Sequence, residues 1–148
     1  MGIWSWVKRL VTGESGPQTN PLSPAQNQPA WFDGNEDFKL RVVGEFHYQR
    51  TFEEICGPRT EAGENRIVTA VLILDNTNRY DNNAVRVEVE GKTVGHLGRS
   101  DASAFRTRLH NERVTAQTFT CKARIRGGWM RENRERGLYG INLDVRLY

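Results

Sequence analysis

Cysteine and histidine are scarce in this sequence. Of its 148 residues, two are cysteines, Cys56 and Cys121, and three are histidines. The two cysteines lie far apart without a Cys-x-x-Cys or Cys/His spacing, whereas structural zinc sites draw four such ligands at short intervals. The sequence therefore predicts no metal centre and no other cofactor. It also indicates reduced thiols in an intracellular, cytoplasmic protein.

Long apolar runs are also missing. No stretch of about 18 consecutive apolar residues is present, so we expect no membrane-spanning helix. Residues 1–11 lack the charged start, apolar centre and small-residue cleavage site of a secretion signal. These absences argue against a membrane partner.

The usual catalytic patterns are absent too. A phosphate-binding loop of the form GxxxxGK[ST] does not occur, and the aspartates show no spacing typical of a metal-dependent nuclease. Cys56, followed by Gly57 and Pro58, comes nearest to a nucleophile, but cysteine is among the residue types most often buried. We predict no catalytic residues and no enzymatic activity.

Positive charge is unevenly distributed along the chain. There are 21 Lys and Arg against 18 Asp and Glu, a net charge of +3. Residues 1–37 contain two basic and four acidic side chains, which leaves nineteen basic and fourteen acidic ones, a net +5, in residues 38–148. Most of the cations are Arg, which binds phosphate in a bidentate manner and stacks on bases. This bias fits a nucleic-acid partner without proving it.

Composition divides the chain into three parts. Residues 13–37 hold four of the five prolines among Ser, Gln, Asn and Gly, a composition that cannot bury enough apolar area to offset chain entropy. We expect a flexible linker there, preceded by a short amphipathic segment over residues 1–12. That segment is either a frayed tail, or a helix packed on its own domain, or an anchor for a membrane surface or a partner such as a helicase. Residues 38–148 form the folded domain.

Alternating apolar and polar residues after residue 38 predict half-buried strands. They fall at residues 40–48, 85–89, 93–97, 119–125 and 139–147, and a nearly continuous apolar run at residues 66–74 predicts a further, central strand. Six short strands joined mostly by hairpins predict a mainly β fold, a small OB-like six-stranded barrel with one or two short helices. Barrel closure is the simplest way to satisfy the edges of so many short strands.

One helix and one long loop interrupt these strands. Ser100 is a candidate N-cap, and Ala102, Phe105 and Leu109 would share one face of the helix that follows. Residues 127–137 form a hairpin loop that is too long for a tight turn and too charged to be buried. The cations on and before this loop either extend a nucleic-acid path or form a solvated face. They are Lys122, Arg124, Arg126, Arg131, Arg134 and Arg136.

The most specific patterns are three short motifs. They are Val42-Val43-Gly44, then Tyr80-Asp81-Asn82-Asn83-Ala84-Val85 in an Asn-rich loop, then Val94-Gly95-His96-Leu97 at the end of a hairpin. In this order and spacing they resemble the motifs of the HIRAN domain family, over residues 40–144. The resemblance implies a stand-alone member of a family whose OB-like barrel, in fork-remodelling helicases, holds the 3′ end of a single DNA strand.

The same resemblance implies a binding site. Tyr80 would stack on the terminal bases, Asp81 would accept a hydrogen bond from the 3′-hydroxyl, and His96 would contact a phosphate. Stacking on an aromatic ring tolerates any base. An ionised carboxylate accepts a hydrogen bond from a hydroxyl but repels a phosphate in the same place. The supporting positions near bases and phosphates are Asn78, Arg99 and His47.

The sequence departs from the family at one pair of adjacent residues. The best-known members carry Arg-Tyr where this chain has Phe46-His47, so ring stacking is retained and one phosphate contact is lost. Two functions stay open. One is a module that binds single-stranded DNA, at its 3′-hydroxyl end, in DNA repair, replication or nucleic-acid processing. The other is a protein-interaction adaptor on the same barrel without DNA binding. RNA remains a possible ligand, since pocket details decide whether a 2′-hydroxyl is accepted.

Overall fold

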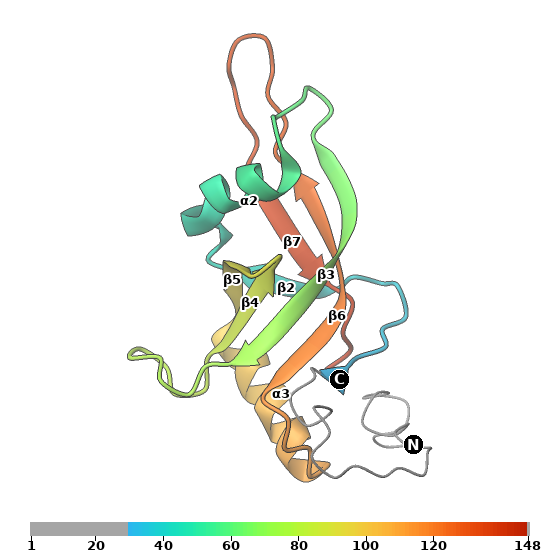
Figure 1. Ribbon diagram of the computed structural model, residues 1–148, viewed down its shortest axis with the longest axis vertical. Coiled ribbons are helices and arrows are strands. Elements are labelled where there is room, and N and C mark those ends of the chain that lie inside the picture. The colour runs from blue at the N-terminus through green and yellow to red at the C-terminus, as the bar shows by residue number, and fades with distance from the viewer. Residues whose placement is uncertain (1–29, 148) are drawn as a thin grey trace, which may run out of the picture.

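A computed structural model describes residues 30–147 of the chain (Figure 1). Its elements in chain order are β1 (Ala30–Trp31), β2 (Leu40–Val43), the 3-10 helix η2 (Glu45–Tyr48), α2 (Gln49–Cys56), β3 (Glu64–Leu74), β4 (Val85–Val89), β5 (Lys92–Leu97), α3 (Arg99–Asn111), β6 (Thr118–Gly127) and β7 (Tyr139–Leu143). The predicted amphipathic segment 1–12 and residues 13–29 of the predicted linker lie outside the described residues.

Six of the strands form a closed antiparallel barrel. Their hydrogen-bonded order is β6-β3-β4-β5-β2-β7, and β7 pairs again with β6 to complete the ring. The two-residue β1 adds to β6 in parallel. The prediction of a mainly β, six-stranded barrel with short helices is therefore confirmed, with α2 and α3 as the two α-helices of residues 30–147.

Alternation along the strands explains the core. In β6, Phe119, Cys121, Ala123 and Ile125 are fully buried, whereas the residues between them face outward. This strand pairs with β3 over ten residue pairs, so the two form the longest ladder of the barrel. Side chains that alternate in this way fill the barrel interior and leave the outer wall to polar groups.

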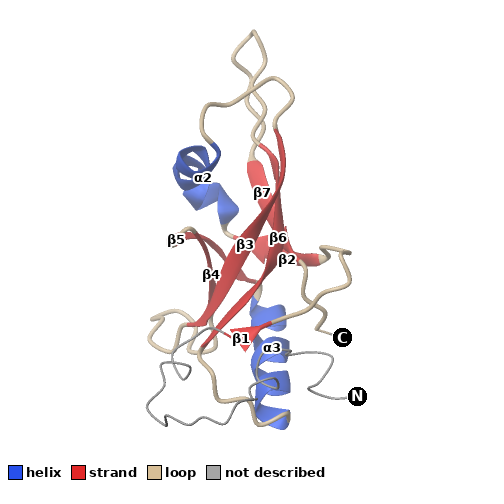
Figure 2. Ribbon diagram, turned by 45° about the vertical axis from the view of Figure 1, so that its right-hand side comes forward, coloured by secondary structure: helices blue, strands red, loops and turns tan. Residues whose placement is uncertain are grey.

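An aromatic cluster ties α3 and the segment before β2 to one end of the barrel. Phe105, on the predicted apolar face of α3, and Phe119 of β6 have ring centroids 5.5 Å apart. The ring of Phe32 lies 5.4 Å from Phe105 and 5.1 Å from Phe119, and Phe32 is only 2% exposed. Figure 2 shows α3 at this end of the barrel and the hairpin loop between β6 and β7 at the other.

Residues 30–37, which composition assigned to the linker, lie on the barrel. They supply β1 and Phe32, and Asp144 then accepts hydrogen bonds from the Glu36 N–H at 2.9 and 3.1 Å. Asp144 is itself buried, with 3% exposure, so the contact closes the turn against the end of β7. The division between linker and domain at residue 37 stays a prediction, because the rest of the linker is not described.

Three local predictions were wrong. Residues 45–48, expected in the first strand, form η2, because Gly44 adopts a left-handed conformation with φ 80° and turns the chain out of the sheet. The N-cap of α3 is Gly98 rather than Ser100, since the Gly98 carbonyl accepts the Ala102 N–H at 2.8 Å. The last strand ends at residue 143, because the Asp144 side chain turns inward to the residue 36 amide.

No helix within residues 30–147 is long and apolar enough to cross a bilayer.

Candidate nucleic-acid interface

The Asn-rich loop between β3 and β4 is held by its own side chains. Asn78 Oδ1 accepts the backbone N–H of Tyr80 at 2.9 Å and of Asp81 at 3.1 Å. Asp81 Oδ1 in turn accepts the N–H of Asn83 at 2.9 Å. Such bonds between side chains and the nearby backbone fix the conformation of a loop without help from the flanking strands. Asn78 therefore shapes the loop, which is a structural role beside the ligand contact predicted for it.

Arg106 of α3 fastens this loop to the rest of the domain. Its guanidinium donates to the carbonyl oxygens of Asn83 and Ala84 and to Asn76 Oδ1, all at 2.8 Å. The two ends of the loop are thus bonded to α3. The sequence did not single out Arg106, because only the fold brings a residue of α3 to a loop 22 residues or more away along the chain.

The Tyr80 ring projects from this fastened loop into solvent. It is 82% exposed, an unusual state for a large aromatic side chain. Next to it in the chain, the Asp81 carboxylate is only 23% exposed, and its Oδ2 lies 4.0 Å from Arg99 Nε at the start of α3. Arg99 itself is 80% exposed. The predicted residues Tyr80, Asp81 and Arg99 are therefore neighbours at one edge of the domain.

His96 lies on the outer wall of the barrel. In the strand register it stands between Val43 of β2 and Arg86 of β4, and Arg86 stands beside Ile73 of β3. Burial lowers the pKa of His96 from its usual value, while the Asp75 carboxylate acts in the raising direction and Arg86 in the lowering one. His96 is thus biased toward its neutral form, in which one ring nitrogen donates a hydrogen bond and the other accepts one.

The glycine of the Val-Gly-His motif lets β5 approach β2. A Cβ atom on Gly95 would lie 2.5 Å from Val42 Cγ1 and 2.7 Å from the Val43 carbonyl oxygen. No other residue fits this contact without displacing β2. Gly95 therefore fixes the distance between the two strands that carry His96 and lead to η2.

The helix η2 presents two exposed rings at the surface. Phe46 is 70% exposed, and its ring meets the exposed His47 edge-on at a centroid distance of 5.6 Å. The following Tyr48 ring lies 6.5 Å from His96. Glu45 holds η2 to β7, since its Oε2 accepts the Ile141 N–H at 2.6 Å. In the sequence, Phe46 stood out only as a replacement for the family's Arg, yet it is among the most exposed apolar side chains described.

The six predicted residues form two groups. Asn78, Tyr80, Asp81 and Arg99 belong to the loop and the start of α3. His96 and His47 belong to the wall and η2, where His47 contacts Phe46. The ion pair of 3.3 Å between Arg86 Nη1 and Asp75 Oδ2 connects the groups, because Arg86 flanks His96 and Asp75 begins the loop.

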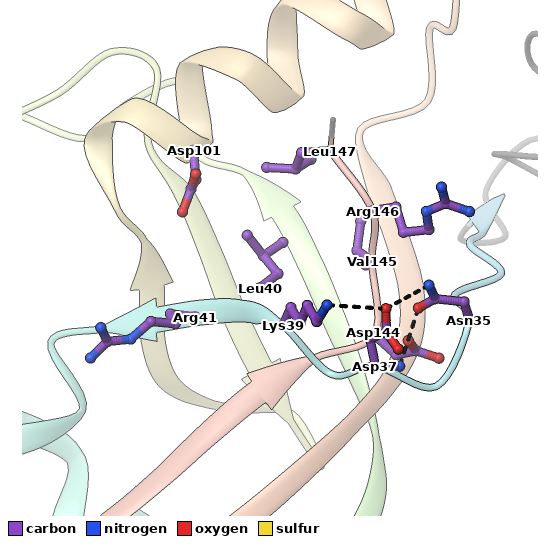
Figure 3. Close-up of a pocket in the computed structure, with 10 residues that line it drawn as sticks. All are labelled: Asn35, Asp37, Lys39, Leu40, Arg41, Asp101, Asp144, Val145, Arg146 and Leu147. Atoms are coloured by element: carbon purple, nitrogen blue, oxygen red, sulfur yellow. Dashed lines mark hydrogen bonds and ion pairs between the residues drawn. The ribbon is translucent and has the colours of Figure 1, made fainter.

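A separate hollow lies beside β2 (Figure 3). It has a volume of about 450 Å³ and is lined in part by Lys39, Arg41 and Arg146, but also by Asp37, Asp101 and Asp144. Lys39 Nζ lies 3.6 Å from Asp37 Oδ2, and Asp144 is already bonded to the residue 36 amide. Because the lining holds as many carboxylates as cations, the hollow shows no preference for an anion, and the lining residues include none of the six predicted ones.

Comparison with known proteins agrees with the three motifs. No curated protein and no solved structure is similar enough to this chain to count as a match. The family model described as the HIRAN domain matches residues 39–134, which span β2 through β6 and part of the hairpin loop. This family is associated with nucleic-acid binding. Because the match covers most of the described residues, the chain belongs to the HIRAN domain family.

Proposed function

We propose that this domain binds single-stranded DNA and captures a free 3′-hydroxyl end, acting as a binding module without catalysis. The observation that carries the proposal is the 82% exposed Tyr80 ring on a fastened loop, directly beside the half-buried Asp81 carboxylate. An exposed aromatic ring costs free energy in water unless a ligand covers it. Base stacking on such a ring contributes about 1 to 3 kcal/mol per base.

The Asp81 carboxylate would select a strand that ends in a free 3′-hydroxyl. Asp81 uses Oδ1 for the loop, and its Oδ2 faces Arg99 at the long distance of 4.0 Å, which leaves room for a hydroxyl donor. A terminal phosphate in the same place would meet a negative charge. In this proposal Arg99 and His96 contact phosphates further along the strand.

Replacing Asp81 by Asn tests end capture. Asn keeps an oxygen for the Asn83 N–H and removes the charge, so the loop should survive. We expect the wild type to bind a short strand with a 3′-hydroxyl about tenfold more tightly than the same strand with a 3′-phosphate. In Asp81→Asn this ratio should fall to near one. Fluorescence anisotropy of labelled oligonucleotides measures both.

Glu61→Gln is the control for this variant. It removes one negative charge from an exposed position in another loop, so the end preference should stay as in the wild type. Equal binding of both end forms by the wild type would reject end capture. Absence of binding to any single strand would instead favour a protein-interaction adaptor, for which the exposed Phe46 and Val43 offer apolar contacts.

The pH dependence of binding tests the role of His96. Because burial lowers the pKa of His96, the free protein holds it neutral near pH 7. A nearby phosphate favours the protonated form, so DNA binding should take up a proton and tighten severalfold from about pH 7.5 to about pH 5.5. His96→Gln should flatten this dependence, whereas His110→Gln, at the exposed end of α3, should leave it unchanged. A profile unaltered in His96→Gln would refute the phosphate contact.

A further inference from the structure

The outward residues of β6 form a ladder of cations. Lys122, Arg124 and Arg126 alternate with the fully buried Cys121, Ala123 and Ile125. Residues two apart on a strand are separated by about 6.6 Å and point to the same side. The three cationic side chains therefore stand in a row on the outside of the barrel, at intervals comparable to those of phosphates along a stretched strand.

Strand register adds Arg41 to this row and connects it with the candidate site. Arg41 of β2 stands beside Asn142 of β7, which stands beside Arg124. Two residues further along the same outward side of β2 is Val43, the partner of His96. We name Arg41, Lys122, Arg124 and Arg126 the cationic wall. Arg41, at one end of the cationic wall, is about 6.6 Å along β2 from Val43, which is the strand partner of His96.

The cations of the wall differ from most others in the described part of the chain. Within residues 30–147, none of the four makes an ion pair of 4.0 Å or less with a carboxylate. In contrast, the hairpin loop cations Arg131 and Arg136 face Glu135 at 3.3 Å and Glu53 at 3.8 Å. Of the predicted cation run, Arg131 and Arg136 are thus ion-paired, whereas Lys122, Arg124 and Arg126, and also Arg134 in the loop, have no such pair among the described residues.

Two features of the cationic wall favour a ligand that carries both phosphates and bases. Arg124 lies over the Phe38 ring at 4.4 Å, and its Nε is buried without a hydrogen-bond partner among the described residues. Beside it is a hollow of about 260 Å³ lined by Arg124, Arg126, Gly140, Asn142 and the 60% exposed Leu138. An apolar side chain and cations in one hollow suit a nucleotide better than a free anion.

We propose that the cationic wall binds the phosphates of the same DNA strand after it leaves the end site, toward its 5′ side. This inference rests on the proposed function, because the end site sets where the strand starts. The domain would then hold two stretches of one strand: the terminal nucleotides at Tyr80 and His96, and a following stretch along β6. The wall reads charge and not sequence, since its contacts are to phosphates.

The test compares strands of two lengths with the double variant Lys122→Ala/Arg126→Ala in the full chain. Both side chains are exposed, and Arg124 keeps its place on Phe38. For a strand of about 16 nucleotides, the slope of log K against log salt should become shallower by about 1.4, because each lost phosphate contact removes about 0.7. For a strand of about four nucleotides, affinity and end preference should match the wild type.

The matched control is Lys92→Ala/Arg131→Ala. It removes the same net charge from cations already paired with Glu54 and Glu135, so the slope for the long strand should change little. An unchanged slope in the wall variant, or an equal change in the control, would overturn the wall. If end capture itself failed, the short strand would show no 3′-hydroxyl preference even in the wild type, while the slope for the long strand would still report on the wall.

Discussion

Replacing Tyr80 by Ala is expected to weaken binding of a single strand by about 1 to 3 kcal/mol, which is a factor of about 5 to about 150 in Kd. The ring is 82% exposed, so little packing is lost with it. The backbone N–H of residue 80 still donates to Asn78 Oδ1, so the loop should keep its form. Anisotropy titration gives the affinity, and thermal unfolding should show an unchanged Tm.

Two companion variants make this result specific. Tyr80→Phe keeps the ring and should retain most of the affinity, because stacking needs the π face and not the hydroxyl. Leu138→Ala removes another exposed apolar side chain, outside the end site, and should leave binding of a short strand unchanged. Wild-type affinity in Tyr80→Ala would show that the exposed ring is not the stacking platform.

Replacing Phe105 by Ala should lower the free energy of unfolding by about 3 to 5 kcal/mol. Phe105 is fully buried between the rings of Phe32 and Phe119, so the substitution leaves a cavity where three elements meet. Urea unfolding at constant m-value measures the loss. Ser103→Ala, at an exposed position on the same helix, should change stability by less than about 0.5 kcal/mol. A similar small effect of Phe105→Ala would contradict the cluster.

Periodicity was sufficient for the barrel but not for its short connections. The alternation in β6 is long, and burial follows it residue by residue. The apolar run of β3 does not give burial in the same way, since residues 64–69 are exposed or half-buried and Ile67 is 50% exposed. Residues 45–48 alternate as well, yet their neighbour Gly44 adopts φ 80° and ends the strand, which a pattern of apolar residues does not encode. The helix α2 was not assigned, although Phe52 and Ile55 have helical spacing, because eight residues give a weak signal.

The candidate site was predictable where one segment carries it. The turn at Asn78 and Asp81 follows from residue types that neighbour each other in the chain, whereas the exposure of Tyr80 does not, because a large aromatic residue is more often buried. The contacts that join the parts of the site are tertiary contacts between residues far apart in the chain. Arg106 of α3 bonds to the loop, and Arg41 and Arg124 are both strand partners of Asn142 in β7. Neither relation can be predicted before the strands and helices are placed.

The pairing of β6 has a consequence for solvent exchange. On one edge, all ten residues of β6 pair with β3. On the other edge, the carbonyl oxygens of Thr120 and Lys122 accept hydrogen bonds from the Phe32 and Asp144 N–H groups, and pairing with β7 begins at Ala123. Amide hydrogens in a strand enclosed on both edges exchange with solvent mainly through opening of the whole domain. The exchange rates of β6 amides therefore report global unfolding, and the two-residue β1, short as it is, extends that protection to the end of β6 beside α3.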